Sequence, residues 1–512
     1  MTLSPAILTF FGTWKLAKYD TLSGIAASFL KLRKTTNIAL ILCAFSTSIL
    51  SAQTLTVLHN FDNTDGSYPW GGLVQAPNGY YYGTTSGGGA HSQGTIFKIT
   101  PGGVFSTVYN FCSQGGDTCT DGEQPRTGLM LDSNGYLYGT TLFGGANNRG
   151  TIYRITPAGV LTTLYSFCSL ASCTDGWAPY GVLLQAHSGY IYGTTNQAGE
   201  YNSGTVFGST LAGGLTTLYS FCATTGCPDG AHPSAVLIQA GNGVFYGTTS
   251  AGGANESACG GDGCGTVFKL TGGTVTTLYS FCSEPDCIDG AEGPYPSGLV
   301  LGPNGNIYGV TQFGGPTNNG TVFKITPSGA LTTIYGFCTQ TGCPDGQTPL
   351  GGLILASDGN FYGTTESGGA DGYGTIFQIT PSGTLTTLLS FDNTNGGLPY
   401  APPVQGTNGY FYGTTYQDGA HGNGTVYRLS TGLAPFVKTV PTSGVVGAAV
   451  KILGNELTGA TSVSFNGTAA VFTVVSSVEI TTTVPSGATS GIVQVVTPTA
   501  TLTSNVAFEV LP

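Results

Sequence analysis

Charged side chains are scarce in this sequence, and positive ones are the scarcest. The 512 residues include 14 Lys and Arg against 25 Asp and Glu, so 8% of the chain is charged and the net charge is −11. Proteins that bind nucleic acid neutralise its phosphates with clustered Lys and Arg. The composition therefore argues against a nucleic-acid partner and predicts a neutral, polar surface.

Motifs of the common catalytic and cofactor sites are missing as well. The chain has no HExxH, no GxSxG and no P-loop. Its Gly-rich loops lead into predicted strands rather than into a helix that could bind phosphate. The five histidines are scattered over different loops and strands: His59, His91, His187, His232 and His421. We expect no catalytic residues, no metal and no cofactor.

Long hydrophobic runs are confined to the N-terminal region. Residues 38–50 are apolar, a stretch too short to span a bilayer comfortably. Lys31, Arg33 and Lys34 precede it and the small residue Ala52 follows, which is the order of a secretion signal. Residues 1–52 are therefore predicted to be an export region, with an uncleaved anchor as the alternative. The mature chain would then have no membrane span and would reside outside the cell, at its surface or in the periplasm.

Glycine and tandem repeats dominate what is present. There are 83 glycines, and 40% of residues are hydrophobic, which is enough to build a core. Tyr-Gly-Thr-Thr begins at Tyr82, Tyr138, Tyr192, Tyr246, Tyr362 and Tyr412, and Tyr-Gly-Val-Thr at Tyr308. Each copy is followed by Gly-Thr-(Ile/Val)-(Phe/Tyr), which starts at Gly94, Gly150, Gly204, Gly265, Gly320, Gly374 and Gly424. Seven copies of one unit predict a repeat architecture.

Each repeat contains four short strand candidates, a to d, separated by turn signals such as Asn-Gly and Pro-Gly. Residues 182–184 are an example of strand a. Four strands per repeat favour a propeller blade over an open solenoid. The seventh repeat stops after strand c at Leu429, whereas residues 55–61 resemble the strand d at residues 385–391. We predict an all-β chain in which residues 53–431 form a seven-bladed propeller closed by this N-terminal strand.

Twelve of the thirteen cysteines form six local pairs, and Cys43 lies in the export region. The pairs are Cys112/Cys119, Cys168/Cys173, Cys222/Cys227, Cys259/Cys264, Cys282/Cys287 and Cys338/Cys343. A structural zinc site needs four ligands close together, and no pair has a second pair or a histidine nearby in sequence. The pattern therefore favours six disulfides and an oxidising compartment.

The repeat pattern GGxNGxxYGTTxxGG…GTxFxxT resembles the GloVer family of exported bacterial proteins, also called choice-of-anchor proteins, over residues 54–430. The resemblance implies export and usually a C-terminal surface anchor, but no established activity. This chain departs from the family there, because it shows no hydrophobic tail followed by basic residues.

Residues 434–512 are similar to an IPT/TIG domain, an immunoglobulin-like sandwich, and we predict the domain to occupy residues 432–512. The matching residues are Pro441, Gly444, Gly447, the run 450–454, the run 463–467, Val484, Pro485, Gly491 and the run 506–508. Such domains bind protein or sugar, or act as spacers, and the spacer role is favoured.

Variable positions inside a fixed repeat are where a binding site could be encoded. The loop from strand d to the next strand a follows Asp-Gly-x-x-Pro-x, and its Asp is interpreted as a turn residue, with a calcium-binding ring as the alternative. The candidate ligand-binding residues in these loops are Tyr68, Trp70, Glu123, Arg126, Trp177, Tyr180, His232, Glu292, Tyr295 and Tyr400. Aromatic rings with a few polar groups suit a sugar, although packing between blades is an alternative use for these rings.

Three functions remain open. The favoured one is a non-enzymatic recognition or scaffold protein that binds a glycan or a surface protein through the loop-rich face. A carbohydrate-active hydrolase or lyase is the second, with Glu123 and Glu292 as a conceivable carboxylate pair. A structural envelope protein without a small ligand is the third.

Overall fold

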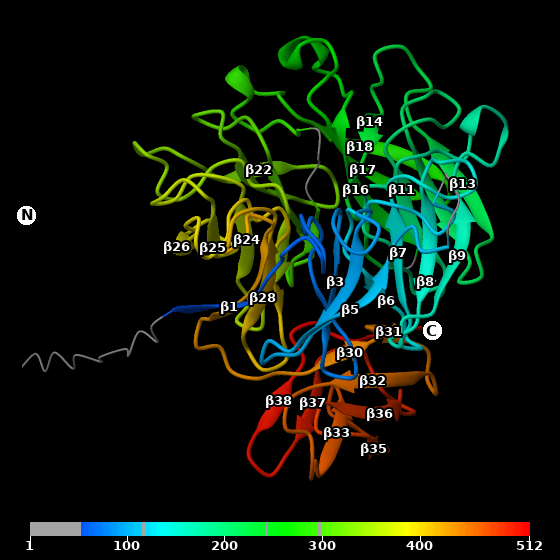
Figure 1. Cartoon of the computed structure of the whole chain (residues 1–512), viewed down its shortest axis with the longest axis vertical. Coiled ribbons are helices and arrows are strands. Elements are labelled where there is room, and N and C mark those ends of the chain that lie inside the picture. The colour runs from blue at the N-terminus through cyan, green and yellow to red at the C-terminus, as the bar shows by residue number, and fades with distance from the viewer. Residues whose placement is uncertain (1–52, 115–118, 242, 294–297) are drawn as a thin grey trace, which may run out of the picture. The chain divides into compact units, whose positions relative to one another are not determined.

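The computed structural model describes residues 53–114, 119–241, 243–293 and 298–512, which consist almost entirely of β-strands and loops (Figure 1). The helices in these ranges are three short 3-10 turns: η2 (Ala171–Cys173), η3 (Glu256–Cys259) and η4 (Pro285–Cys287). None of them is long or apolar enough to cross a membrane. The all-β class is confirmed, and the predicted export region lies outside the described residues.

Seven antiparallel sheets follow one another along the chain, and we call them blades 1 to 7. Blade 1 contains β2 (Val74–Gln75), β3 (Tyr81–Thr85), β4 (Thr95–Ile99) and β5 (Phe105–Asn110). Blade 2 contains β6 (Met130–Leu131), β7 (Leu137–Thr141), β8 (Thr151–Ile155) and β9 (Leu161–Ser166). Blade 3 contains β10 (Leu184–Gln185), β11 (Ile191–Thr195), β12 (Thr205–Ser209) and β13 (Leu215–Ser220).

The remaining blades repeat this order. Blade 4 contains β14 (Ala231–Pro233), β15 (Ile238–Gln239), β16 (Val244–Ala251), β17 (Thr266–Thr271) and β18 (Thr274–Ser280). Blade 5 contains β19 (Val300–Leu301), β20 (Ile307–Thr311), β21 (Thr321–Ile325) and β22 (Leu331–Gly336). Blade 6 contains β23 (Leu353–Leu355), β24 (Phe361–Thr365), β25 (Thr375–Ile379) and β26 (Leu385–Ser390), and blade 7 contains β27 (Val404–Gln405), β28 (Phe411–Thr415) and β29 (Thr425–Ser430). The strand predicted at residues 182–184 is β10, which is shorter and begins two residues later.

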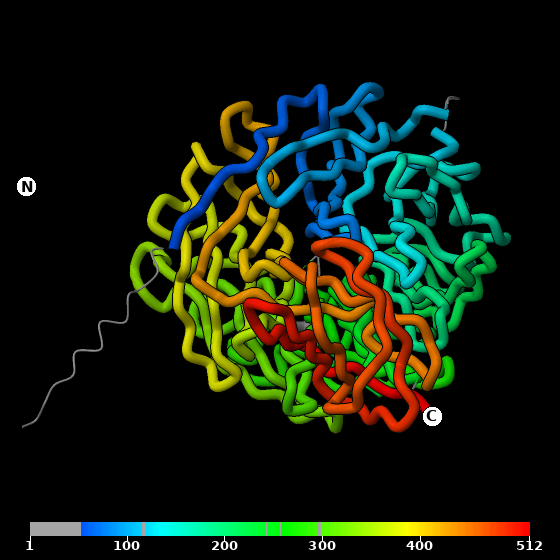
Figure 2. Tube along the Cα trace, turned by 90° about the horizontal axis from the view of Figure 1, so that it is seen from below, coloured from blue at the N-terminus to red at the C-terminus, as the bar shows by residue number. Residues whose placement is uncertain are grey.

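The N-terminal strand β1 (Thr54–Asn60) closes the ring, as the repeat order predicts. It pairs antiparallel with β29, with Thr54 opposite Ser430 and Asn60 opposite Thr425. Figure 2 shows β1 in blue beside the orange end of the propeller, with the blades between running through cyan, green and yellow. The last blade therefore takes its outer strand from the other end of the repeat region, and no repeat sheet is left with a missing strand.

A buried hydrophobic cluster fills each of the seven junctions between neighbouring blades. In every junction the Phe that follows the outermost strand meets an aromatic ring of the next blade edge-on, with ring centroids 5.2 to 5.4 Å apart. At the closing junction this pair is Phe61 with Phe97, at 5.2 Å. The closure is thus packed like the other six junctions.

The repeated threonines form a polar contact inside each blade. The second Thr of Tyr-Gly-Thr-Thr and the Thr of Gly-Thr lie opposite each other, with hydroxyl oxygens 2.8 or 2.9 Å apart in all seven blades. Both threonines of each pair are buried. A buried hydroxyl needs a hydrogen-bonding partner, so the two motifs must occur together.

The repeated glycine and proline form a contact between blades. A Cβ atom at Gly374, whose φ is +96°, would lie 2.4 Å from the Thr365 carbonyl oxygen and 2.8 Å from Pro399 Cδ in the next blade. Five other glycines face the proline of the following blade in this way: Gly94, Gly150, Gly204, Gly320 and Gly424. The Asp-Gly-x-x-Pro loop of one blade therefore packs against the Gly-Thr motif of the blade before it.

The loop aspartates hold turns together. Asp175 is fully buried and accepts hydrogen bonds from the Tyr165 hydroxyl at 2.8 Å, the Ser169 N–H at 2.8 Å and the Leu170 N–H at 3.2 Å. Asp121, Asp229, Asp289 and Asp345 bind the corresponding Tyr hydroxyl at 2.7 or 2.8 Å. Burial is the main cause that raises the pKa of Tyr165 to about 12, so this hydroxyl remains a donor at neutral pH. The geometry matches the turn interpretation rather than a calcium ring.

Long loops and tight turns occupy opposite ends of each blade, as the order of strands in a meander requires. The loops that carry cysteines contain six disulfides, which join the pairs expected from the sequence. They are Cys112–Cys119, Cys168–Cys173, Cys222–Cys227, Cys259–Cys264, Cys282–Cys287 and Cys338–Cys343. Five follow the outermost strand of a blade, and Cys259–Cys264 lies in the loop between β16 and β17.

The second cysteine of a pair has a backbone role that the sequence did not predict. Cys119, Cys227 and Cys343 have positive φ angles of +44°, +45° and +47°. The carbonyl oxygen of each accepts the N–H of the loop glycine three residues later, at 2.7, 2.8 and 2.9 Å. Each also accepts the N–H of a glycine in the loop between the second and third strands of the next blade, at 3.0, 2.9 and 2.8 Å.

Cys119, Cys227 and Cys343 form the predicted disulfides and have this backbone role in addition. Their carbonyl groups also join two loops of the blade that follows. Cys173 and Cys287 make the same two bonds in their own loops, to Gly176 and Gly199 and to Gly290 and Gly315. A backbone bond leaves no mark on a side-chain pattern, which is why the cysteine spacing could not show it.

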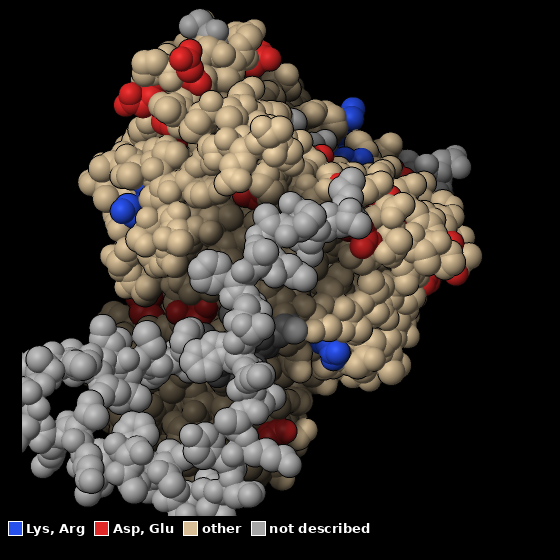
Figure 3. Space-filling model, turned by 90° about the vertical axis from the view of Figure 1, so that its left-hand side faces the viewer, with Lys and Arg blue, Asp and Glu red and all other residues tan. Residues whose placement is uncertain are grey.

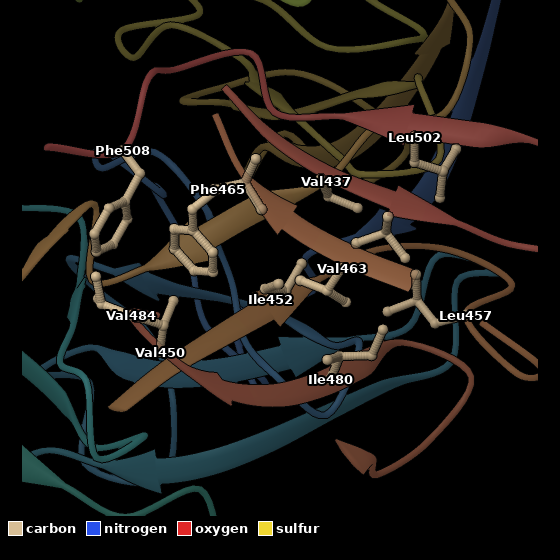
Figure 4. Close-up of a cluster of buried hydrophobic side chains, with 12 residues drawn as sticks. Val437, Val450, Ile452, Leu457, Val463, Phe465, Ile480, Val484, Leu502 and Phe508 are labelled. Carbon is tan, nitrogen blue, oxygen red and sulfur yellow. The ribbon is translucent and has the colours of Figure 1, made fainter. Parts of the chain in front are cut away.

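Two small sheets build the C-terminal sandwich. One contains β30 (Lys438–Val440), β32 (Ala449–Leu453), β36 (Glu479–Thr483) and β35 (Phe472–Val474), and the other β34 (Thr468–Ala470), β33 (Ser462–Phe465), β37 (Val493–Val496) and β38 (Thr501–Thr503). A parallel pair, β31 (Ser443–Gly444) and β39 (Glu509–Val510), completes it. Figure 4 shows its core, where Phe465 meets Phe508 edge-on at 5.0 Å.

Replacing Gly374 by Ala should lower the free energy of unfolding by about 3 kcal/mol, because it adds a steric clash to a strained backbone. Gly372→Ala is the matched control, since Gly372 also has a positive φ of +88° but no atom within 4 Å of an added Cβ. We expect a loss of about 1 kcal/mol there. Urea denaturation of both variants tests this, and equal losses would contradict the close Gly–Pro contact.

Replacing Asp175 by Ala should cost about 2–3 kcal/mol, because several buried donors lose a charged acceptor. The exposed Asp371→Ala is the control and should change stability by less than about 0.5 kcal/mol. Calcium or a chelator should leave the unfolding midpoint of the unaltered chain unchanged. If calcium raised the unfolding midpoint of the unaltered chain but not that of Asp175→Ala, the result would support a calcium site formed by the loop aspartates.

Candidate functional site

The variable positions of the Asp-Gly-x-x-Pro-x loops fall into three geometric classes. The first x bonds to its own blade: the Glu123 N–H donates to the Phe143 carbonyl at 3.0 Å, and Trp177 pairs likewise with Gln197. The second x bonds to the preceding blade, as when the Tyr68 N–H donates to the Asn423 carbonyl at 3.0 Å. The x after the proline leads into the innermost strand.

Residues of the third class in neighbouring blades lie together. Trp70 of blade 1 has its ring centroid 4.6 Å from that of Tyr400 in blade 7, and the Arg126 guanidinium of blade 2 lies 5.3 Å from the Trp70 ring. Tyr416 lies 4.7 Å from Tyr400 and 5.2 Å from Trp70. We call Tyr68, Trp70, Arg126, Tyr400 and Tyr416 the aromatic cluster.

The cluster is open to solvent in part. Each of its five side chains is half-buried, which is unlike the fully buried Tyr and Phe residues between the blades. Tyr68 joins it through Tyr416, with ring centroids 5.2 Å apart. An array of rings with accessible faces offers a flat, apolar surface to a ligand.

Two polar groups border these rings. The Tyr400 hydroxyl donates to Glu366 Oε1 at 3.4 Å, and burial raises the pKa of the Glu366 carboxyl. The Arg126 Nη2 donates to Gln124 Oε1 at 3.3 Å, whereas its Nε is buried and has no acceptor within the part of the chain that the structure describes. In those same ranges no acidic side chain forms an ion pair with Arg126. A buried donor without an acceptor is costly, which suggests that a ligand supplies one.

The other predicted residues lie elsewhere. Trp177 has the Arg149 guanidinium 4.4 Å from its ring and packs against the core between blades 2 and 3. His232 has its Nδ1 2.9 Å from the Asn196 carbonyl oxygen. Glu292 is buried, its N–H donates to the Cys264 carbonyl, and it lines a cavity at blade 4.

Three further predicted residues need separate mention. Burial raises the pKa of Glu123, which is half-buried at its own loop. Tyr180 occupies the third class of position in blade 3 and is half-buried. Tyr295 lies outside the described residues.

The predicted cysteines contribute no group to the aromatic cluster. Cys119 is buried, whereas Cys227 and Cys343 are half-buried. In all three the sulfur is bound in a disulfide and the carbonyl oxygen is bound to two glycine N–H groups. Their role is to shape the loops, and they offer neither a thiol nor a backbone acceptor to a ligand.

Sequence reasoning missed Glu366 and Tyr416. Both occupy the position directly after Tyr-Gly-Thr-Thr, which also varies between repeats: Ser86, Leu142, Asn196 and Ser250 stand there in other blades. The Tyr416 N–H donates to the Leu398 carbonyl in the loop of its own blade at 3.1 Å, and the Tyr416 ring lies 5.2 Å from that of Tyr68 in the loop of the next blade. Variation at that position was the available signal.

A cavity of about 840 Å³ lies away from the aromatic cluster. Its walls are mainly apolar and include Leu73, Met130 and Leu183 of the propeller and residues of β30 to β32. Burial lowers the pKa of Lys438 in this wall to about 8, and its ammonium already donates to the Gln405 carbonyl. We give the aromatic cluster precedence because it varies within the repeat and contains an unsatisfied donor.

Charge is sparse around the molecule, as Figure 3 shows for one face, where isolated basic and acidic side chains stand among uncharged residues. This matches the low charged fraction of the sequence.

Solved structures with similar folds do not identify an activity. A fungal alcohol oxidase in complex with copper is 12% identical, with 90% of this chain and 99% of that chain covered and a TM-score of 0.47. An ulvan lyase is 10% identical, with coverage of 71% and 94% and a TM-score of 0.42. An auxiliary nutrient-binding protein from Bacteroides thetaiotaomicron is 14% identical, with coverage of 74% and 76% and a TM-score of 0.39. At these values the likenesses carry no functional argument.

Family comparison is decisive where these likenesses are not. No curated protein matches the sequence. The family model of the Gloeobacter/Verrucomicrobia repeat matches residues 117–291 and 258–469, which is more than half of the chain, and the IPT/TIG domain model matches residues 435–510. The chain belongs to the Gloeobacter/Verrucomicrobia repeat family and ends in an IPT/TIG domain.

Proposed function

We propose that this protein is an exported, non-enzymatic recognition protein whose aromatic cluster binds an acidic glycan. The observation that carries the proposal is the contact between the Arg126 guanidinium and the Trp70 ring, beside Tyr400 and Tyr416. Sugar rings have apolar C–H faces that stack on aromatic rings, and their polar edges are read by a few placed hydrogen-bonding groups.

The acidic character of the ligand follows from Arg126. Its buried Nε lacks an acceptor within the described ranges, and a carboxylate or sulfate would supply one with a charge-assisted hydrogen bond. Arg also binds planar carboxylates in two-pronged geometry, which Lys cannot do. A uronic acid or a sulfated sugar satisfies both the aromatic surface and the guanidinium.

Export is supported by the six disulfides, since such bonds persist in oxidising compartments. We place the protein outside the cell, at its surface or in the periplasm. Propeller and IPT/TIG boundaries near residues 53–431 and 432–512 fit a division of labour in which the first binds and the second spaces or docks against a surface protein.

A carbohydrate-active lyase or hydrolase is the second candidate, and one observation favours it. Glu366 lies next to the cluster with a pKa raised by burial, and its carboxyl oxygen accepts from the Tyr400 hydroxyl. A carboxyl group that holds its proton at higher pH is a suitable general acid. Product formation from any glycan that the protein binds would decide between binding and catalysis.

Trp70→Ala should weaken glycan binding about tenfold or more, because truncating a central aromatic anchor removes its stacking surface. Trp177→Ala is the matched control: it is the same residue type, half-buried and also beside an arginine, and should bind normally. The measurement is a screen of the oxidised full-length chain on acidic and neutral glycans, followed by titration of any ligand found. Circular dichroism confirms that each variant is folded.

Arg126→Gln should in addition remove the preference for acidic over neutral glycans and the dependence of binding on salt. Equal losses in Trp70→Ala and Trp177→Ala would contradict the proposed site. If the folded chain bound no glycan at all, a structural envelope role would replace recognition of sugar.

A further inference from the structure

The four cysteines of blade 4 lie in one cluster, although the sequence presents them as two separate pairs. Cys259 and Cys264 belong to the loop between β16 and β17, and Cys282 and Cys287 to the loop that follows β18. In the structure all four Sγ atoms lie within 4.8 Å of one another. The two pairs are separate in sequence, and the fold of this blade brings them together in space.

Strand register explains why the two loops meet. Strands β17 and β18 are antiparallel with Thr266 opposite Ser280, so Cys264, two residues before Thr266, lies beside Cys282, two residues after Ser280. Cys259 and Cys287 are each five residues from their disulfide partners. The Sγ atoms of Cys259 and Cys282, which belong to different disulfides, are 3.7 Å apart.

We propose that these four cysteines form a tetrathiolate zinc site when the chain is reduced, and that the two disulfides are the oxidised form of the same site. Structural zinc sites are tetrahedral, and a Zn–S bond of about 2.3 Å places neighbouring sulfurs about 3.8 Å apart. The four Sγ atoms already lie within 4.8 Å of one another, close to this arrangement. Two Cys-x4-Cys pairs on two neighbouring loops are also a spacing close to that of known structural zinc sites.

The surroundings suit a buried metal centre. Cys264 and Cys282 are 1% and 8% exposed and belong to a hydrophobic cluster that includes Phe281 and Ala291. An apolar shell excludes water and lowers the local dielectric constant, which strengthens the attraction between thiolates and a divalent cation. Across the described ranges, this is the one group of three or more His, Cys, Asp or Glu residues whose ligand atoms lie close enough to share a metal ion.

A path for the cation is present as well. A cavity of about 480 Å³ is lined by Cys259 and Cys287 and by the acidic residues Asp262 and Glu292. Negative side chains along a cavity wall raise the local concentration of cations. An entry path next to the two more exposed cysteines is what a loadable metal site requires.

The disulfide form of the four cysteines is converted into the zinc form in two steps, reduction and metal binding. Each disulfide accepts two electrons and two protons from an external dithiol, which leaves as its own disulfide. Two dithiols therefore yield four cysteine thiols, and zinc binding releases their protons to the solvent as the thiolates coordinate the metal. An external disulfide reverses both steps: zinc leaves as the thiolates regain protons, and each cysteine pair then passes two electrons and two protons to one external disulfide, which leaves as its dithiol.

The test uses the full-length chain, reduced with a dithiol that is then removed without oxygen, and titrated with Co²⁺ as a spectroscopic probe. We expect one tightly bound equivalent, with sulfur-to-cobalt charge-transfer bands and the visible bands of tetrahedral cobalt, and displacement by Zn²⁺. Cys259→Ser/Cys264→Ser should lose this equivalent. The matched control, Cys338→Ser/Cys343→Ser, removes a disulfide outside the cluster and should keep it.

Identical cobalt binding in the two double variants, or no tetrahedral thiolate spectrum in the reduced chain, would overturn the proposal. Near-ultraviolet circular dichroism monitors folding throughout. If reduction unfolds the chain, zinc should restore the native spectrum in the unaltered chain and in Cys338→Ser/Cys343→Ser but not in Cys259→Ser/Cys264→Ser, and failure of that restoration also overturns the proposal.

Discussion

The propeller depends on one repeated contact between blades, in which the loop proline of one blade packs against a glycine of the blade before it. At Gly374 there is no room for a side chain, and Pro399 occupies the space that a Cβ would need. Proline has a fixed φ, and the residue before it bonds across the junction, as the Leu398 N–H does to the Tyr373 carbonyl. Six of the seven junctions have this glycine–proline contact, and at the junction of blades 4 and 5 Gly265 faces Glu292 instead.

This junction also decides which residues are available for function. The residue before the proline is hydrogen-bonded to the preceding blade, as the Leu398 N–H is to Tyr373. The residue after the proline leads into the innermost strand. Trp70, Arg126 and Tyr400 come together because blades 7, 1 and 2 are consecutive across the closure. A site assembled from three blades is thus a consequence of the same contact that stabilises the ring.

Repetition made the fold predictable, and the loss of repetition limited prediction of the site. Tyr-Gly-Thr-Thr and Gly-Thr recur because buried Thr hydroxyls need each other, so seven blades and the displaced strand β1 could be derived from the sequence. The innermost strands were predicted too long, since apolar runs such as residues 182–184 reflect burial rather than pairing. Sequence position alone could not separate Trp70 from Trp177, because the Asp-Gly-x-x-Pro-x template does not reveal that its first and last variable residues face different neighbours. It also could not show that two cysteine pairs distant in sequence share one pocket.

The closing pair of β1 and β29 makes the order of assembly different from the order of synthesis. Thr54 and Ser430 end one ladder, so the ring is cyclic in space and is cut once, inside blade 7. Among the propeller strands, β1 is therefore made first and its partner β29 is made last, so Phe61 stays unburied until the whole repeat region has emerged. A truncated chain that lacks the seventh repeat would expose the unpaired strand β1 and the hydrophobic side chains that blade 7 covers in the complete ring.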